Sequence, residues 1–216
     1  IDALKGFLII AVIIGHLFNT GVADNQWKWL IYGWHMPLFF GVSGYLCNLQ
    51  RLRQKKTPTL LRYYGERLLI AWFFAFLLYT TIVVHPNSVK ALIRTLLYPW
   101  YHLWFIPVYF LYIVIARYLR LNESVLLTAS GFISLASLSY FGLGSYSGAR
   151  QELDFMPEFV KVIMGDKRIY TMALFFFFGI WVKSKEKVLL KLSAVKLASI
   201  LAISTIVLWT YLFSSP

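Results

Sequence analysis

The sequence predicts an all-α protein, a polytopic bundle of about seven transmembrane helices with a cytoplasmic N-terminus, on three observations. Of the 216 residues, 59% are hydrophobic and 19% are aromatic, while only 14% are charged, against roughly a quarter in soluble domains. The mean hydropathy is +0.66. The apolar residues gather in segments of spanning length, and most basic residues lie between them. We therefore expect a single multi-pass domain over residues 1–216, in the plasma (inner) membrane.

Seven apolar segments follow one another along the chain. A helix of about 20 residues crosses the hydrocarbon core of a bilayer, and most of the segments approach this length. The fourth segment carries a proline and the sixth is short, so these two are the least regular. The segments lie at residues 3–20, 29–48, 68–85, 101–119, 124–141, 169–183 and 194–213.

Two basic clusters determine the expected orientation. Residues 51–67 hold six basic side chains and one acidic side chain, and residues 183–191 hold four basic side chains. When alternate loops are assigned to opposite sides, fourteen basic residues lie on the side of these clusters and seven lie on the other. The positive-inside rule places the richer side in the cytoplasm. The N-terminus is therefore expected inside, and the longest loop, 142–168, outside.

Several classes of protein and site are disfavoured. The formal net charge of +12 does not indicate nucleic-acid binding, because the basic residues form short clusters between apolar segments. The single cysteine, Cys47, cannot form an internal disulfide, and no spacing of Cys or His residues indicates a metal site. A cleavage-like stretch before Asp24 would suit a signal peptide, but the many later segments favour retention of the first segment as a helix.

The first segment carries two polar groups that lipid disfavours. Lys5 and His16 are eleven residues apart, so in a helix they lie about 20° apart around the axis and roughly 16 Å apart along it. An ionisable side chain within a span is a functional candidate by default. The alternatives are that Lys5 is an interfacial anchor or pairs with Asp2, and that His16 is hydrogen-bonded between helices.

All four histidines are expected in the outer half of the bundle or at its interface. His16 and His35 lie at similar depth in the first two segments, whereas His85 and His102 lie at segment ends, where an interfacial role is the simpler account. Imidazole is the side chain best suited to take a proton from a hydroxyl near neutral pH. His16 and His35 are therefore the candidate catalytic residues.

Four stretches, in order along the chain, resemble the acyltransferase-3 family of membrane acyltransferases. The start of the chain is similar to the family's first-helix signature, a basic residue, ten residues and then His, matched here by Lys5 and His16. The second stretch resembles the family's second helix, with His35 in its place. The four stretches are IDALKGFLIIAVIIGH, WHMPLFFGVSGYL, HLWFIPVYF and LFFFFGIWV.

The sequence departs from the family pattern at two places. Position 5 is Lys where Arg is commoner. Before the third helix, where many members carry two basic residues three apart, this chain has Tyr64 and Arg67. Family members also contain further helices, so this chain is expected to be a fragment that lacks C-terminal helices.

The resemblance implies transfer of an acetyl or other acyl group from cytoplasmic acetyl-CoA to a hydroxyl of an extracytoplasmic glycan or related acceptor. Basic side chains near the cytoplasmic side suit the phosphates of CoA, although topology alone also explains most of the basic loop. The candidate CoA-binding residues are Lys5, Arg62 and Arg67.

Aromatic residues crowd the expected outer ends of the segments. Their rings suit stacking on sugars, although an interfacial aromatic belt also explains them. The candidate acceptor-binding residues are Trp34, His102 and Trp104. Two other functions remain open, a secondary transporter and a non-catalytic membrane partner of glycan export. A requirement for acetyl-CoA distinguishes the acyltransferase from both.

Overall fold

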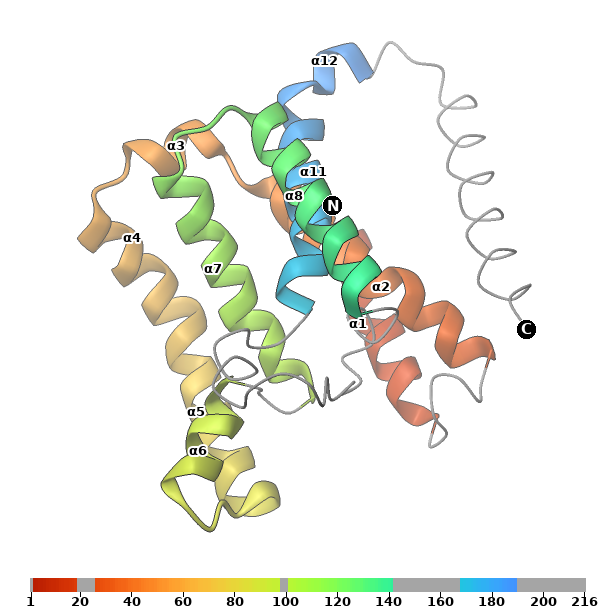
Figure 1. The fold of residues 1–216 in the computed structure, drawn as a ribbon, viewed down its shortest axis with the longest axis vertical. Helices are drawn as coiled ribbons and strands as arrows, with labels where there is room; N and C mark the ends of the chain where they lie inside the picture. The colour runs from red at the N-terminus through yellow and green to blue at the C-terminus, as the bar shows by residue number, and fades with distance from the viewer. Residues whose placement is uncertain (1, 19–25, 98–100, 142–167, 190–216) are drawn as a thin grey trace. The chain divides into compact units, whose positions relative to one another are not determined.

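The computed structural model describes residues 2–18, 26–97, 101–141 and 168–189, and every regular element in these ranges is helical (Figure 1). The all-α prediction is therefore confirmed for this part of the chain. The chain divides by contact into two units, Ile1–Trp181 and Val182–Pro216. In the second unit, the described residues are the end of α11 and the short helix α12 (Glu186–Leu189), where Lys183 Nζ lies 2.6 Å from Glu186 Oε2.

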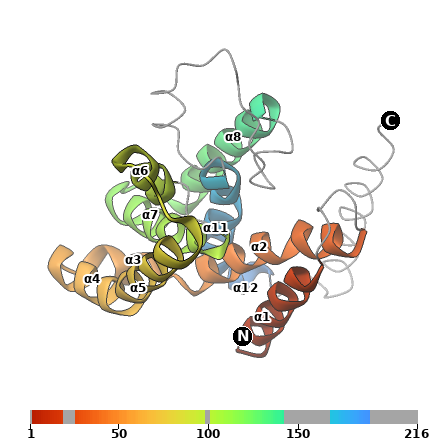
Figure 2. The ribbon, with the colours of Figure 1, turned by 90° about the horizontal axis from the view of Figure 1, so that it is seen from below.

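The first two predicted segments are α1 (Asp2–Leu17) and α2 (Gln26–Leu46), which pack against each other (Figure 2). Phe7 of α1 stacks on Trp34 of α2 with the ring centroids 5.6 Å apart. Stacked aromatic rings add to the apolar area that the contact buries. This contact fixes one face of α1 against the helix that carries His35.

The third segment forms a longer helix than the sequence predicts. α4 (Thr57–Tyr64), the π-helix η1 (Gly65–Leu69), α5 (Ile70–Tyr79) and the π-helix η2 (Thr80–Val84) are continuous over Thr57–Val84. The helix begins at Thr57 rather than near residue 68 because Pro58 falls in its first turn, where a missing N–H is harmless. It ends at His85, whose φ of 43° is left-handed.

This 28-residue helix, with a mean hydropathy of 2.0 in its most apolar window, is the one described helix that meets both the length and the composition needed to cross a bilayer. Two shorter apolar helices accompany it, Phe105–Tyr118 and Glu123–Ser139. The prediction of helices that are long and apolar enough to cross a bilayer is thus confirmed for the helix Thr57–Val84.

Besides α12, two short helices lie outside the predicted segments. α3 (Leu49–Gln54) begins after Asn48, whose side-chain oxygen accepts a hydrogen bond of 2.9 Å from the Arg51 N–H. α6 (Val89–Leu97) begins after Ser88, whose hydroxyl oxygen accepts one of 3.2 Å from the Ala91 N–H. Both starts are side-chain caps. A search for apolar segments of spanning length does not detect helices this short.

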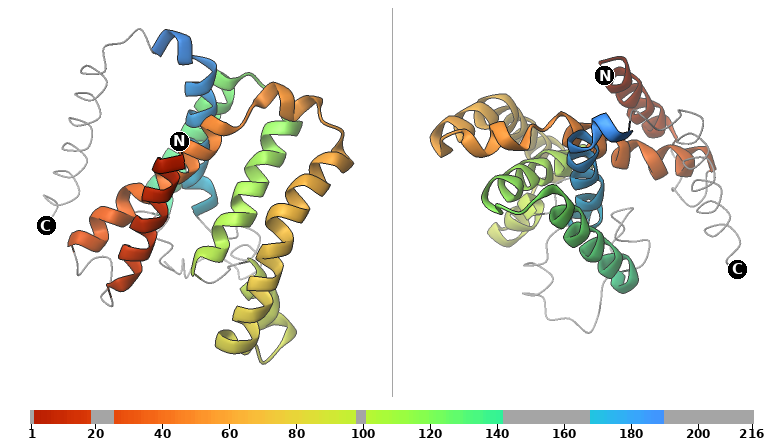
Figure 3. Two further views of the ribbon diagram at one scale, coloured as in Figure 1. Left: turned by 180° about the vertical axis from the view of Figure 1, so that it is seen from behind. Right: turned by 90° about the horizontal axis from the view of Figure 1, so that it is seen from above.

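The next three segments are also helical. The fourth is a 3₁₀ turn, η3 (Tyr101–Trp104), followed by α7 (Phe105–Tyr118); the fifth is α8 (Glu123–Phe141) and the sixth is α11 (Arg168–Ser184). The predicted segment 194–213 lies outside the described residues. α7 lies beside the long helix (Figure 3). Trp72 Nε1 of the long helix donates a 2.7 Å hydrogen bond to the Leu103 carbonyl in η3, directly before α7.

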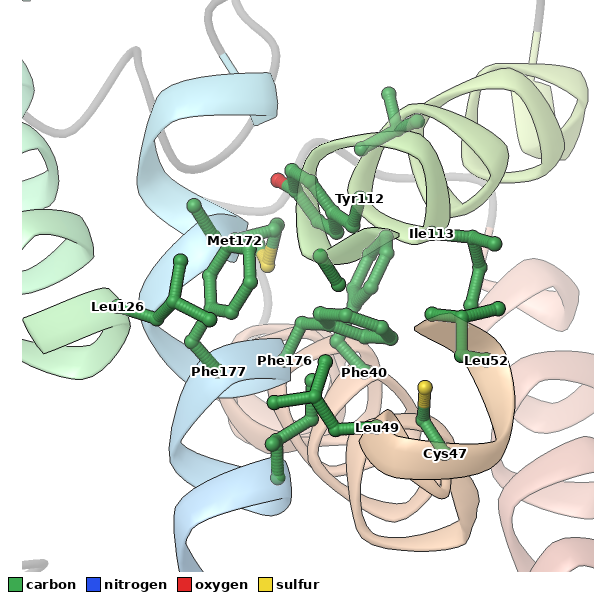
Figure 4. Close-up of a cluster of buried hydrophobic side chains, with 14 of the residues drawn as sticks. Phe40, Cys47, Leu49, Leu52, Tyr112, Ile113, Leu126, Met172, Phe176 and Phe177 are labelled. Atoms are coloured by element: carbon green, nitrogen blue, oxygen red, sulfur yellow. The ribbon is translucent and has the colours of Figure 1, made fainter. Parts of the chain in front are cut away.

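An aromatic core joins α2, α7 and α11 (Figure 4). Phe40, Tyr112 and Phe176 come from these three helices and are almost completely buried. The ring of Tyr112 lies 5.5 Å from that of Phe40 and 5.4 Å from that of Phe176 between centroids. The Tyr112 hydroxyl donates to the Ile169 carbonyl, which satisfies the polar end of a buried ring.

Glycines allow the backbones of α2 and α11 to approach closely. A Cβ atom added to Gly44 would overlap the carbonyl oxygen of Phe176, and one added to Gly179 would overlap the carbonyl oxygen of Gly41. Contacts through small residues are typical of helices that pack inside membranes. The crossing holds the two helices against the aromatic core.

Candidate active site

The pairing of α1 with α2 brings the two candidate catalytic histidines together. His16 lies in the last turn of α1 and is half-buried, and His35 lies in α2. The two imidazoles are close enough for their charges to interact. The structure has the two histidines on neighbouring helices that pack together, and their similar depth in a membrane stays a prediction.

His35 is the more enclosed of the two histidines. Its side chain is 2% exposed, and its Nδ1 lies 2.7 Å from the carbonyl oxygen of Ile31, one turn earlier in α2. A carbonyl oxygen can only accept a hydrogen bond, so Nδ1 carries the proton and donates it. In the neutral ring, Nε2 is therefore the basic nitrogen, and the hydrogen bond fixes the orientation of the ring.

A third basic group, Lys28, lies near His16. Lys28, near the start of α2, donates a 3.0 Å hydrogen bond from Nζ to the Phe18 carbonyl, which follows the end of α1. A cation is favourable at a helix C-terminus, where the carbonyl groups lack partners within the helix. The Lys28 charge also interacts with His16. Sequence reasoning assigned Lys28 only to an outer loop, because this contact joins two helices.

Lys5 lies in the first turn of α1, at the opposite end from His16. Its Nζ is 3.3 Å from Asp2 Oδ1, which is the pairing that the sequence suggested. The Lys5 side chain is 45% exposed and that of Asp2 is 97% exposed. A pair this exposed is weak, so the Lys5 ammonium remains available to a stronger anion.

The two predicted arginines differ in their surroundings. Arg62 Nε lies 2.8 Å from Glu66 Oε1, the acid of its own segment. Arg67, in η1, donates a 3.0 Å hydrogen bond to the Tyr63 hydroxyl. Both are exposed, and they lie on the same stretch of the long helix. The structure therefore pairs Arg62 with a carboxylate and Arg67 with an aromatic side chain.

The predicted acceptor-binding residues do not form one described cluster. Trp34 is half-buried against Phe7, and Trp104 is 4% exposed. The Arg168 guanidinium lies 4.1 Å from the centre of the Trp104 ring. The His102 side chain lies outside the described residues. Trp104 is thus enclosed by protein in the described part of the chain, and its role in acceptor binding stays a prediction.

An open groove of about 720 Å³ runs along the long helix between Arg62 and Phe74. Its lining is almost wholly apolar apart from the Arg62–Glu66 pair. Within the described ranges, no three His, Cys, Asp or Glu side chains lie together where they would hold a metal ion.

These features define a class of protein, one whose described part is all-helical, with one helix long and apolar enough to cross a bilayer and with two histidines on adjacent helices whose charges interact. A family model described as an acyltransferase domain matches residues 1–216. The chain therefore belongs to the acyltransferase-3 family, which confirms the resemblance seen in the four sequence stretches.

Two curated relatives are similar to parts of the chain, and both are named nodulation protein NolL. The protein from Sinorhizobium fredii is 44% identical over 59 residues, covering 24% of this chain and 16% of the relative. The protein from Mesorhizobium japonicum is 38% identical over 109 residues, covering 44% of this chain and 28% of the relative. The matches thus span less than a third of either relative. No solved structure matches.

Proposed function

We propose that this protein is a multi-pass enzyme of the plasma (inner) membrane that transfers an acetyl group from cytoplasmic acetyl-CoA to a hydroxyl of an extracytoplasmic glycan or related acceptor. The observation that carries the proposal is the His16–His35 pair, within a chain of the acyltransferase family. O-acyl transfer requires a group that accepts the hydroxyl proton, and imidazole does this near neutral pH.

The surface of the described helices supports a membrane location. Large apolar side chains on three helices are more than half exposed, with Ile13 of α1 at 57%, Phe74 of α5 at 66% and Phe132 of α8 at 71%. Extensive exposed apolar surface is unfavourable in water and marks contact with lipid or protein. A bilayer would cover these side chains.

The histidine pair supplies the proton transfer of the proposed reaction. Nε2 of an imidazole takes the proton of the acceptor hydroxyl. The hydroxyl oxygen attacks the carbonyl carbon of the acetyl-CoA thioester at the same time. The new ester C–O bond forms, the C–S bond breaks, and the CoA thiolate leaves and takes the proton back from the imidazolium, which restores the neutral base. The Ile31 carbonyl keeps Nδ1 of His35 protonated, so that Nε2 is the nitrogen able to accept a proton.

The most direct test is to incubate membranes that contain the protein with acetyl-labelled acetyl-CoA and to measure label in the glycan fraction. We expect label to appear only with active protein, and to remain attached as a base-labile ester. Acceptor modification or transport that proceeds without acetyl-CoA would contradict the proposal and favour the transporter or the non-catalytic partner.

The orientation can be tested with single cysteines. Native Cys47 is only 8% exposed, so the background reaction is expected to be small. We expect a cysteine at Lys56, in the basic cluster, to react with a membrane-impermeant maleimide only from the cytoplasmic side, and a cysteine at Ser147 only from outside. The opposite labelling pattern would overturn both the topology and the assignment of sides to the site.

The role of Lys5 can be tested with variants that remove or keep its positive charge. If its ammonium contacts a phosphate of the donor, Lys5→Met should weaken the apparent affinity for acetyl-CoA by about 1.5–3 kcal/mol, the value of a lost hydrogen bond to a charged group. Lys5→Arg should keep most of the affinity. Asp2→Asn removes the exposed partner and serves as the control, with little expected effect. Unchanged affinity in the Met variant would leave Lys5 as an interfacial anchor.

A further inference from the structure

The short helix α6 presents an apolar face to its surroundings. Residues at i, i+3, i+4 and i+7 fall on one side of a helix, because 3.6 residues complete a turn. In α6 all four side chains at these positions are aliphatic, and between 42% and 74% of each is exposed. We call this side the aliphatic face; its residues are Val89, Leu92, Ile93 and Leu96. Apolar surface that the protein leaves this open marks contact with lipid or with another protein.

The other sides of α6 have different surroundings. Thr95 is 8% exposed, and its hydroxyl donates a 3.0 Å hydrogen bond to the Ala91 carbonyl one turn earlier, so this side packs against protein. Lys90 is exposed, and the sequence places Arg94 one turn later on the same side of the helix. The sequence of α6 contains no acidic residue. The helix thus has an aliphatic face, a basic side next to it, and a side that contacts the protein.

The position of α6 in the chain indicates what covers the aliphatic face. The long helix Thr57–Val84 is long and apolar enough to cross a bilayer, and α6 begins after only four intervening residues, 85–88. The start of α6 therefore lies within about 18 Å of the end of the long helix. Ile82 and Val83, in the last turn of the long helix, are more than half exposed, so its apolar surface extends almost to this link. A bilayer crossed by the long helix therefore places α6 at or near its surface.

The length and side chains of α6 suit the membrane surface rather than another crossing. Nine residues span about 14 Å along a helix axis, which is less than half of the hydrocarbon core. Aliphatic side chains also offer no group that could form a hydrogen bond with a sugar acceptor. An apolar face beside basic residues is typical of helices that lie in the membrane plane, with the apolar face among the acyl chains and the cations at the headgroups.

We propose that α6 is an interfacial helix, which lies in the plane of the membrane with its aliphatic face among the lipid acyl chains and its basic side at the headgroup phosphates. The predicted topology puts this helix on the outer surface. Its basic side then explains two of the seven basic residues that the loop count assigns to the outer side. The proposal rests on the membrane location within the proposed function, and it does not depend on acyl transfer.

The test measures the depth of single cysteines in the full chain, with Cys47→Ala removing the native thiol. Each cysteine carries a bimane fluorophore, and the protein is placed in nanodiscs of phosphatidylcholine and phosphatidylglycerol. Three quenchers are compared, which are iodide in the water, a nitroxide lipid labelled near the headgroup, and a nitroxide lipid labelled at the middle of the chain. For Leu92→Cys and Ile93→Cys we expect the lipid labelled near the headgroup to quench about two- to threefold more than the other two quenchers. Lys90→Cys, on the basic side, should be quenched mainly by iodide.

The two ends of the aliphatic face test whether the helix lies in the plane. Val89 and Leu96 are seven residues apart, so a helix along the membrane normal would place them about 10 Å apart in depth. We expect Val89→Cys and Leu96→Cys to give the same ratio of quenching by the two nitroxide lipids. A ratio that differs clearly between these two positions would overturn the in-plane arrangement.

Phe74→Cys is the matched control, because Phe74 is a comparably exposed apolar residue within the long helix and should be quenched most by the lipid labelled at the middle of the chain. Iodide quenching along the aliphatic face would show that water covers it, and quenching by none of the three would show that protein, such as a second copy of the chain, covers it. Either result contradicts the proposal. If Phe74→Cys is still quenched by lipid in that case, the membrane location stands and only the assignment of α6 fails. If Phe74→Cys is not quenched by lipid either, the membrane location itself is wrong.

Discussion

The His16→Ala variant is expected to transfer acetyl groups about 10²–10⁴-fold more slowly than the wild-type protein, which is the usual contribution of a positioned general base. His16 resembles the motif histidine of the family, and its charge interacts with that of His35 on the adjacent helix α2. We expect a loss of similar size for His35→Ala. Initial rates with labelled acetyl-CoA in membranes, normalised to the amount of inserted protein, measure both effects.

Substitutions that keep hydrogen bonding separate catalysis from structure. His16→Gln retains a polar side chain of similar reach but cannot carry a proton at neutral pH. His35→Asn retains an amide nitrogen able to donate to the Ile31 carbonyl in place of Nδ1. If the imidazoles move protons, both variants should be nearly as slow as the alanine variants. A Gln variant with near wild-type turnover would remove His16 from the mechanism and leave His35 as the candidate base.

The positions of the main helices could be predicted because burial and membrane insertion both select long apolar segments. The helices α1, α2, α7, α8 and α11 coincide closely with predicted segments. The early start of the long helix was missed because its first turns are polar, and a search for apolar length stops where charged residues appear. The number of membrane crossings and the cytoplasmic N-terminus stay predictions.

The site was only partly predictable. His16 and Lys5 share a helix, so helical geometry alone relates them, and His35 was found because it is a lone ionisable group in an apolar segment. The contacts of Lys28 with Phe18 and of Arg53 with the end of α7 join residues far apart in the sequence. No local pattern marks such contacts, because they depend on which helices pack together.

The second prediction with a large effect concerns the glycine crossing of α2 and α11. Gly44→Ala should destabilise the protein by at least about 1–3 kcal/mol, the usual range for overpacking, because the added methyl group meets the backbone of Phe176. Backbone atoms cannot relieve the overlap by changing rotamer as a side chain can. The two helices must therefore separate, which loosens the aromatic core around Phe40. Gly179→Ala should act in the same way, since its methyl group would overlap the Gly41 carbonyl and lie 2.7 Å from the Tyr45 nitrogen. Thermal unfolding in detergent, followed by circular dichroism, measures the loss.

Gly33 provides the matched control within the same helix. Apart from the nearby backbone of α2 itself, no atom lies within 4 Å of a Cβ added at Gly33. Gly33→Ala should therefore leave the midpoint of thermal unfolding unchanged or raise it slightly, because alanine favours a helix over glycine by roughly 0.5–1 kcal/mol. The comparison isolates close packing, since both substitutions make the same chemical change in α2 and differ only in what the methyl group meets. If Gly44→Ala unfolds at the same temperature as Gly33→Ala, the helices do not cross at these glycines, and the placement of α11 against α2 must be wrong. If only Gly44→Ala and Gly179→Ala unfold early, the crossing is confirmed as the contact that holds α11 against the helix that carries His35.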